Sequence, residues 1–306
     1  VCCLSSLNLE NYDEWKDEPG FIEDIMRFLD NVLTDFINRA PDSFKDAKYS
    51  AMRERSVGLG VMGFHSFLQR NMIPIESVMA KVWNKKMFQL IDKEVNAASK
   101  KLADERGPCP DAAEYGINER FSNKTAIAPT ASISIICGGA SPGIEPVAAN
   151  SYTHKTLSGS FNVRNKYLRA ILKKYDQDTN EVWSSITTNQ GSVEHLDFLN
   201  QDERDVFKTA FEIDQRWLID HSADRTPYIS QAQSLNVFIP ADIHKKDLHQ
   251  IHYQAWKKGL KSLYYCRSKS IQRAEVVNAS FAKTKKQNNN QENQQSTDYE
   301  ECLSCQ

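Results

Sequence analysis

Redox-capable side chains lie at both ends of the chain. Adjacent cysteines, Cys2 and Cys3, open the sequence, and Cys302 and Cys305 close it with two residues between them. A Cys-x-x-Cys spacing lets two thiols form a disulfide and often lowers the pKa of one of them. Zinc is the alternative, but it needs four ligands, and no second cysteine pair or nearby histidine pair completes the set. We therefore favour a redox dithiol over a metal site or a chance spacing, and we predict no bound metal.

A second chemical feature is the tyrosine pair Tyr264 and Tyr265, which lies in an apolar run near the C-terminus. Adjacent side chains of a strand point to opposite faces, so stacking of both rings requires a local turn of the backbone. The pair is compatible with one-electron chemistry and also with ordinary core packing. Both interpretations remain open at this level.

Small hydroxyl residues follow a short apolar segment at 125–128 that we predict to be a buried strand. The stretch in question is Pro129, Thr130, Ala131, Ser132, Ile133 and Ser134. Free backbone N–H groups and the helix dipole make such a strand-to-helix turn a site for anions. N-capping of the next helix by Thr130 or Ser132 explains the same residues equally well.

The segment 58–63 matches the dinucleotide pattern G-x-G-x-x-G literally. The preceding residues 49–56 are polar and helix-like, and no strand-ending acid lies about 20 residues further on, as a nucleotide site requires. We predict instead that the small residues let a helix at 51–69 pack closely. Cys109 and Cys137 are predicted to be inert, and the seven histidines receive no role.

Composition and charge are those of an ordinary enzyme domain. The chain has 306 residues, 40% of them hydrophobic and 25% charged, with a net charge of -2. This charge gives no electrostatic case for binding nucleic acid or an anionic membrane. No apolar run approaches the roughly 20 residues of a membrane span, and the first residues lack a signal peptide's basic start. Seven unevenly placed cysteines do not form a secreted disulfide framework, so we expect a cytoplasmic protein.

Strands and helices alternate along the sequence, which predicts α/β organisation with parallel strands. Their spacing makes a complete barrel difficult to build from this chain alone. From about residue 277 the sequence is polar, and such a segment cannot offset its ordering entropy by burial, so we expect a mobile tail. We predict strands at 1–9, 125–128, 235–239 and 260–266, and helices at 22–37 after Pro19-Gly20 and at 51–69, 76–105, 205–220 and 247–258. In the helix at 76–105 the 3.6-residue period predicts that Val78 and Val82 face inward with Phe88, Ile91, Val95 and Leu102.

Taken together, several motifs resemble the C-terminal portion of the large (α) subunit of class I ribonucleotide reductase. The resemblance covers essentially the whole chain, and the terminal cysteine pair occupies the expected place. The matching segments are Cys2–Leu9, Arg55–Gly60, Pro129–Ser132, Gly143–Pro146, Ser234–Asn236 and Lys261–Tyr265.

This resemblance implies a fold. The family's α/β barrel has ten strands in two five-stranded halves, and a finger loop carrying the cysteine that becomes a thiyl radical enters it. The chain is then expected to be the second half, about five parallel strands with helices, completed by another chain. Residues 1–276 would form this half-barrel, and residues 277–306 a flexible tail that carries the redox pair.

The resemblance also implies roles for individual residues. Cys2 is expected to be one of two barrel cysteines that reduce the substrate, and Tyr264 and Tyr265 the relay that brings a radical from the small subunit. Cys302 and Cys305 would re-reduce the barrel disulfide and be reduced in turn by thioredoxin or glutaredoxin. The loop from Pro129 to Ile133, with Ser134, would hold the phosphates of a ribonucleoside diphosphate. No cofactor would bind directly, since the radical depends on a metal/tyrosyl site in the small subunit.

One departure from the family pattern is important. The finger-loop motif Asn-x-Cys-x-Glu, the second barrel cysteine and the nucleotide-sensing regions are absent from this sequence. We therefore expect a large subunit divided near the middle of the barrel, by gene splitting or proteolysis, that is inactive without an N-terminal half. The rival interpretations are a free-standing thiol–disulfide oxidoreductase and a non-catalytic assembly protein.

Overall fold

The computed structural model describes residues 1–156 and 159–268, and its centre is a row of parallel strands. The first strand, β1 (Leu4–Asn8), pairs with β2 (Gly58–Met62). On its other side β2 meets the segment 125–127 through a parallel bridge between Leu59 and Thr125. Each strand enters the row in sequence order, which is the arrangement expected of an α/β fold.

The row continues through two further segments. Ile127 forms a parallel bridge with Gln233, and the chain runs on from there into β5 (Val237–Ile239). β5 pairs in parallel with β6 (Cys266–Ser268). Five parallel segments therefore lie side by side, with β1 at one edge and β6 at the other. The predicted α/β class and parallel strand direction are confirmed.

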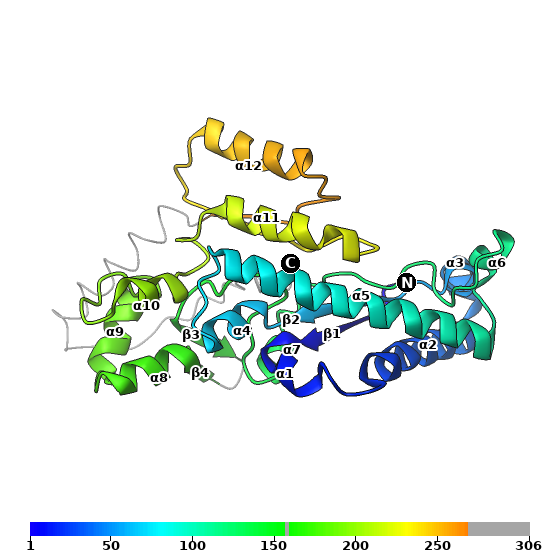
Figure 1. Cartoon of the computed structure of the whole chain (residues 1–306), viewed down its shortest axis with the longest axis horizontal. Coiled ribbons are helices and arrows are strands. Elements are labelled where there is room, and N and C mark those ends of the chain that lie inside the picture. The colour runs from blue at the N-terminus through cyan, green and yellow to red at the C-terminus, as the bar shows by residue number, and fades with distance from the viewer. Residues whose placement is uncertain (157–158, 269–306) are drawn as a thin grey trace, which may run out of the picture.

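Helices cover this row, and Figure 1 shows α11 and α12 stacked on one side of α5 and α2 running along its other side. α2 begins after Gly20, whose φ of 81° few other residues adopt, and buries Ile22, Met26, Leu29 and Leu33. The elements of this part are η1 (Leu9–Asn11), α1 (Tyr12–Trp15), α2 (Phe21–Arg39), η2 (Asp42–Phe44), α3 (Lys45–Glu54), α4 (Phe64–Arg70), α5 (Val78–Arg106), α6 (Pro110–Glu114), α7 (Ile133–Ile136), α11 (Gln215–Arg225), η3 (Thr226–Tyr228) and α12 (Lys245–Lys257).

A smaller second core lies beside the main one, at the left of Figure 1. It is built around buried Trp183 and Phe207, and the sequence predicted no element for its residues before 205. It consists of α8 (Lys166–Lys174), α9 (Asn180–Thr188) and α10 (Gln201–Val206), next to an antiparallel hairpin of β3 (Ser151–Thr156) and β4 (Gly159–Arg164).

The predicted helix at 51–69 is wrong, because its centre is the buried strand β2. The glycines do permit close packing, but of strands and not of helices. A Cβ atom on Gly60 would lie 2.2 Å from the backbone oxygen of Ala126 in the neighbouring segment. Small residues are therefore required here by the approach of two backbones.

Three other predictions need correction. The helix at 205–220 is broken into α10 and α11, because the Asp214 side chain accepts a hydrogen bond from Arg216 N and starts a new helix. The strand at 260–266 is limited to Cys266–Ser268. On α5, Val78 and Val82 were predicted to face inward but are exposed, and the inward position belongs to Asn84, whose amide bonds the His221 carbonyl.

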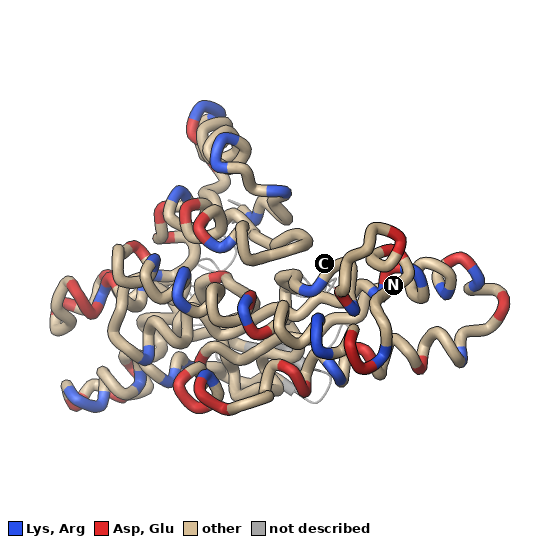
Figure 2. Tube along the Cα trace, turned by 45° about the vertical axis from the view of Figure 1, so that its right-hand side comes forward, with Lys and Arg blue, Asp and Glu red and all other residues tan. Residues whose placement is uncertain are grey.

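Charged residues of both signs are interspersed along the chain, as Figure 2 shows. This distribution agrees with the small net charge of -2. No helix in the described ranges combines the length and the apolar character that crossing a membrane would require.

Candidate functional site

The two adjacent cysteines at the start of the chain lie in opposite environments. Cys3 is buried, and its thiol donates to the Leu29 carbonyl of α2 at 3.5 Å. Burial and the nearby Asp30 carboxylate raise the pKa of the Cys3 thiol, although the charge of Arg55 opposes them. Cys2 is exposed. Strand alternation thus leaves one accessible thiol and one that is held protonated.

Tyr264 and Tyr265 lie immediately before β6, and their rings contact each other. The ring centroids are 4.2 Å apart at an interplanar angle of 57°. Both side chains are close to half-exposed, at 45% and 40%. A hydrogen bond to Tyr265 raises the pKa of the Tyr264 phenol. The pair is therefore a surface feature and does not fill the core.

The backbone explains how neighbouring rings come together. Tyr264 N donates to the Leu235 carbonyl at 2.9 Å, as in a regular strand. Tyr265 N donates instead to the side-chain oxygen of Asn236, also at 2.9 Å. A side chain replaces the usual carbonyl acceptor at this point. This local departure from strand geometry allows the two adjacent rings to contact each other.

The segment from Pro129 to Ser134 forms a tight loop that leads into α7. Thr130 has a φ of 54° and is buried, and its Oγ1 accepts a hydrogen bond from Gly143 N at 2.7 Å. The expected N-cap is wrong, because Ser132 occupies the cap position without capping and Thr130 bonds elsewhere. The backbone N–H groups of Ala131, Ser132 and Ile133 have no acceptor among the described residues. These three donors remain available to a ligand.

A buried carboxylate next to this loop was missed by sequence reasoning. Glu145 is 9% exposed, and its two oxygens accept from the backbone N and the side-chain Nδ2 of Asn236, at 2.9 and 3.2 Å. Burial raises the pKa of Glu145, although the Asn236 hydrogen bonds oppose the shift. Only the resemblance motifs Gly143–Pro146 and Ser234–Asn236 marked these positions, and they suggested no role.

A second missed group supports the far end of the loop. Glu10 follows β1 and is buried, and its carboxylate contacts both the Tyr167 hydroxyl and the Lys166 ammonium. Lys166 also donates to the Gly138 carbonyl at 3.1 Å. The loop beyond α7 is thereby fastened to α8 and to the end of β1.

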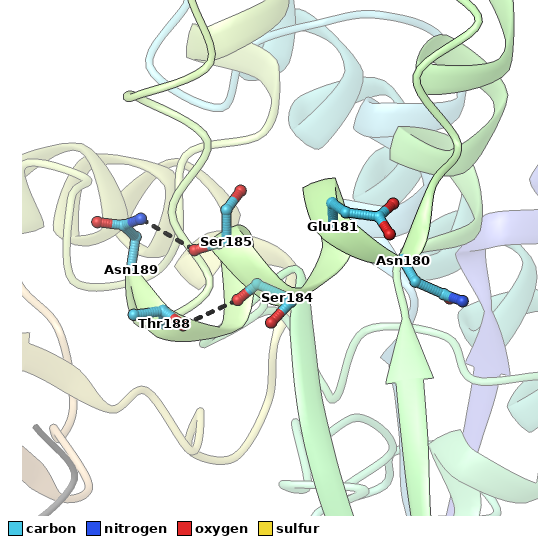
Figure 3. Close-up of a pocket in the computed structure, with 6 residues that line it drawn as sticks. All are labelled: Asn180, Glu181, Ser184, Ser185, Thr188 and Asn189. Atoms are coloured by element: carbon cyan, nitrogen blue, oxygen red, sulfur yellow. Dashed lines mark hydrogen bonds between the residues drawn. The ribbon is translucent and has the colours of Figure 1, made fainter. Parts of the chain in front are cut away.

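One surface pocket, of about 630 Å³, lies on α9 away from these residues (Figure 3). Two of its polar side chains bond to carbonyls of the preceding turn, Asn189 to Ser185 and Thr188 to Ser184. We assign it no function. Among the described residues no group of three or more His, Cys, Asp or Glu side chains could hold a metal. Cys302 and Cys305 lie outside the described residues.

Comparison with known proteins identifies the family. The model of the ribonucleotide reductase barrel domain matches residues 1–119 and 110–266, which together include every described strand except the last two residues of β6. The chain belongs to this ribonucleotide reductase family. The predicted resemblance is confirmed.

Individual relatives agree with this assignment. The ribonucleoside-diphosphate reductase large subunits of invertebrate iridescent viruses 6 and 3 are 50% and 45% identical over 91% and 89% of the chain. The class Id ribonucleotide reductase α subunit of Actinobacillus ureae superposes with a TM-score of 0.82 and 38% identity over 90% of the chain. The chain spans only 29%, 43% and 51% of these three proteins.

Proposed function

We propose that the chain is the C-terminal half-barrel of a ribonucleotide reductase large subunit and takes part in converting ribonucleoside diphosphates to deoxyribonucleoside diphosphates. The observation that carries this proposal is the half-exposed tyrosine pair, with ring centroids 4.2 Å apart, in a chain of this family. An exposed cysteine, Cys2, lies at the other end of the same strand row. Family membership favours this function over a free-standing oxidoreductase or an assembly protein.

The chemistry assigns a task to each group. Replacing the ribose 2′-hydroxyl with hydrogen takes two electrons and releases water, and a dithiol supplies the electrons as it becomes a disulfide. Cys2 is one of these thiols, and its partner comes from the rest of the subunit. The free N–H groups at 131–133 bind the substrate phosphates, because they are unpaired donors at a helix start. Cys302 and Cys305 renew the dithiol and are themselves reduced by thioredoxin or glutaredoxin.

The open strand row supports a partner that completes the barrel. β1 and β6 each pair with one neighbour among the described strands, so each leaves one edge unpaired. Unpaired edges recruit further strands or promote aggregation. An N-terminal half of the large subunit would cover both edges and would supply the radical-forming cysteine. A small subunit with a metal/tyrosyl radical would deliver the radical through Tyr264 and Tyr265, and the assembly would be cytoplasmic.

The test is Tyr265→Phe in the assembled enzyme. Loss of one hydroxyl costs about 1 kcal/mol of stability at most, so fold and nucleotide binding should survive. Turnover should disappear, because phenylalanine cannot be oxidised at an accessible potential. Tyr115→Phe, at a tyrosine that is 82% exposed and distant in sequence, is the matched control and should remain active. Full turnover in Tyr265→Phe would exclude the relay.

A further inference from the structure

Hydrogen bonds and one short backbone turn connect the proposed phosphate-binding loop with the tyrosine pair. At the loop end, buried Thr130 accepts from Gly143 N at 2.7 Å. Two residues further on, Glu145 N donates to the Pro142 carbonyl, so the turn 142–145 is closed on itself. The Glu145 side chain therefore occupies a position fixed by the loop.

Asn236 carries the path across to the tyrosines. Its Nδ2 donates to Glu145 at 3.2 Å, and its Oδ1 accepts from Tyr265 N at 2.9 Å. The Asn236 backbone N also donates to Glu145, at 2.9 Å. Asn236 is 3% exposed, so each end of its amide has a protein partner and water does not compete. The amide is thus held in a single orientation by Glu145.

A buried carboxylate such as that of Glu145 is an unfavourable choice, in free energy, for a contact that only holds the fold together. A carboxylate loses much of its hydration when it is buried, and an amide or an aliphatic side chain would fill the same space at lower cost. Glu145 nevertheless presents both oxygens to one residue. What a carboxylate supplies is two acceptors side by side, which forces the Asn236 amide to turn its oxygen towards Tyr265.

We propose that Glu145 and Asn236 are positioning residues that couple the loop 129–134 to the Tyr264–Tyr265 pair. The ring contact depends on the backbone departure at Tyr265, and that departure depends on the Asn236 oxygen. A displacement of the loop is transmitted through Glu145 to Asn236 and from there to the tyrosine backbone. This inference rests on the proposed function of the loop and of the pair.

An exchange of donor and acceptor tests the coupling. Asn236→Asp keeps an acceptor for Tyr265 N but sets a second carboxyl against Glu145. The two groups can stay bonded only while they share a proton, so the bridge breaks by charge repulsion once the pH is high enough to ionise both. Adding Glu145→Gln restores it with the roles reversed. The glutamine Nε2 then donates to one oxygen of the aspartate, and its Oε1 accepts from the backbone N of residue 236. The other aspartate oxygen still accepts from Tyr265.

Gln215→Ala is the matched control. Gln215 is also buried, and its Oε1 accepts from Phe238 N at 2.7 Å, two residues beyond Asn236 on the same strand. It connects that strand to α11 and not to the loop. Its Nε2 also donates to the Ala210 and Ile213 carbonyls, so its removal costs three buried hydrogen bonds without touching the proposed path.

Turnover and substrate affinity are measured with CDP in the enzyme assembled from all its subunits, together with thermal unfolding of each variant. As the pH is raised and the second carboxyl ionises, Asn236→Asp should lose kcat by about tenfold or more relative to wild type at the same pH, with KM changed by less than about twofold. The double variant should stay within about threefold of wild type over the same pH range. Gln215→Ala should keep its kcat. A folded double variant with kcat still reduced tenfold would overturn the coupling, as would unchanged kcat in Asn236→Asp or equal loss in Gln215→Ala.

Failure of the inference and failure of the proposed function are distinguishable. An inactive wild-type assembly, or an active Tyr265→Phe variant, contradicts the function itself. An active wild type with an inactive Tyr265→Phe variant, but with no rescue in the double variant, contradicts only the bridge. If Asn236→Asp alone unfolds, the comparison of the double variant with wild type still decides the question.

Discussion

Replacing Asp30 with asparagine should destabilise the chain more than any comparable charge removal on its surface. Asp30 lies on α2 with no exposed area, and its carboxylate is bonded to Arg55, Arg106 and Arg120. Burial alone would raise the pKa of this carboxyl, but the arginine hydrogen bonds and the charge of Arg55 outweigh it and lower the pKa. The carboxylate thereby connects α2 with the ends of α3 and α5 and with the segment around residue 120.

The loss of stability in Asp30→Asn can be estimated from the arginine charges that would remain buried without a carboxylate partner. The side chains of Arg55 and Arg120 are only 9% and 11% exposed, so their charges would lose their partner inside the protein. Removing one member of a buried ion pair costs about 3–5 kcal/mol. Three guanidinium groups would also repel one another. Since whole domains are stable by about 5–15 kcal/mol, Asp30→Asn should remove a large fraction of the stability.

Urea unfolding of both forms measures the effect, with Asp35→Asn as the control. Asp35 lies on the same helix and pairs with Arg39 at 3.4 Å, but both side chains are more than 60% exposed, at 63% and 79%. Because the folded pKa of Asp30 is lowered, its contribution is complete above the unfolded pKa of about 3.9 and is lost as the pH falls towards the folded value. The difference between wild type and Asp30→Asn should therefore shrink below about pH 4. Equal destabilisation by the two substitutions would refute the reasoning.

Three further predictions follow from individual groups. Burial lowers the pKa of His65 to about 3 and that of His221 to about 4, so the unfolded chain binds more protons below about pH 6.5, and stability should fall by up to about 1.4 kcal/mol per pH unit for each histidine. His65→Asn keeps an acceptor for Val147 N and should reduce that slope in urea titrations; an unchanged slope would contradict the assignment. In the assembled enzyme Cys2→Ser should abolish thioredoxin-coupled turnover while Cys3→Ser should not, and the reverse result would exchange their roles. Cys302→Ser should block repeated turnover with thioredoxin yet leave activity with dithiothreitol, which reduces the barrel disulfide directly. Equal loss with both reductants would mean that the tail thiols do not carry electrons to that disulfide.

The sequence predicted the parts of the fold that local pattern determines. The 3.6-residue period and the Pro19-Gly20 signal gave α2 with nearly its observed bounds. The apolar start of the chain likewise predicted a strand at 1–9, and β1 lies within it. Both depend on neighbours in the sequence, and side-chain alternation is a property of the backbone itself.

The errors arise where distant segments decide the structure. Gly58 and Gly60 have low strand preference, yet they form β2 because only glycine permits the contact with Ala126. Val78 and Val82 fit the helical period, but Asn84 takes the inward position through its bond to the His221 carbonyl. The Glu145–Asn236 hydrogen bonds join residues far apart in the sequence, so no local sequence pattern could predict them.

Cys2 and Cys3 are adjacent in the sequence, but one thiol is exposed and the other is enclosed. The Cys3 thiol faces α2, where burial and the Asp30 carboxylate raise its pKa and keep it protonated. A protonated, enclosed thiol neither attacks disulfides nor reaches a substrate. Cys2 lies one residue earlier on the opposite, exposed side. The buried Asp30 carboxylate that stabilises the helices thus also helps to raise the pKa of the neighbouring Cys3 thiol, and this contrast supports the proposal that Cys2 is the redox cysteine of the pair.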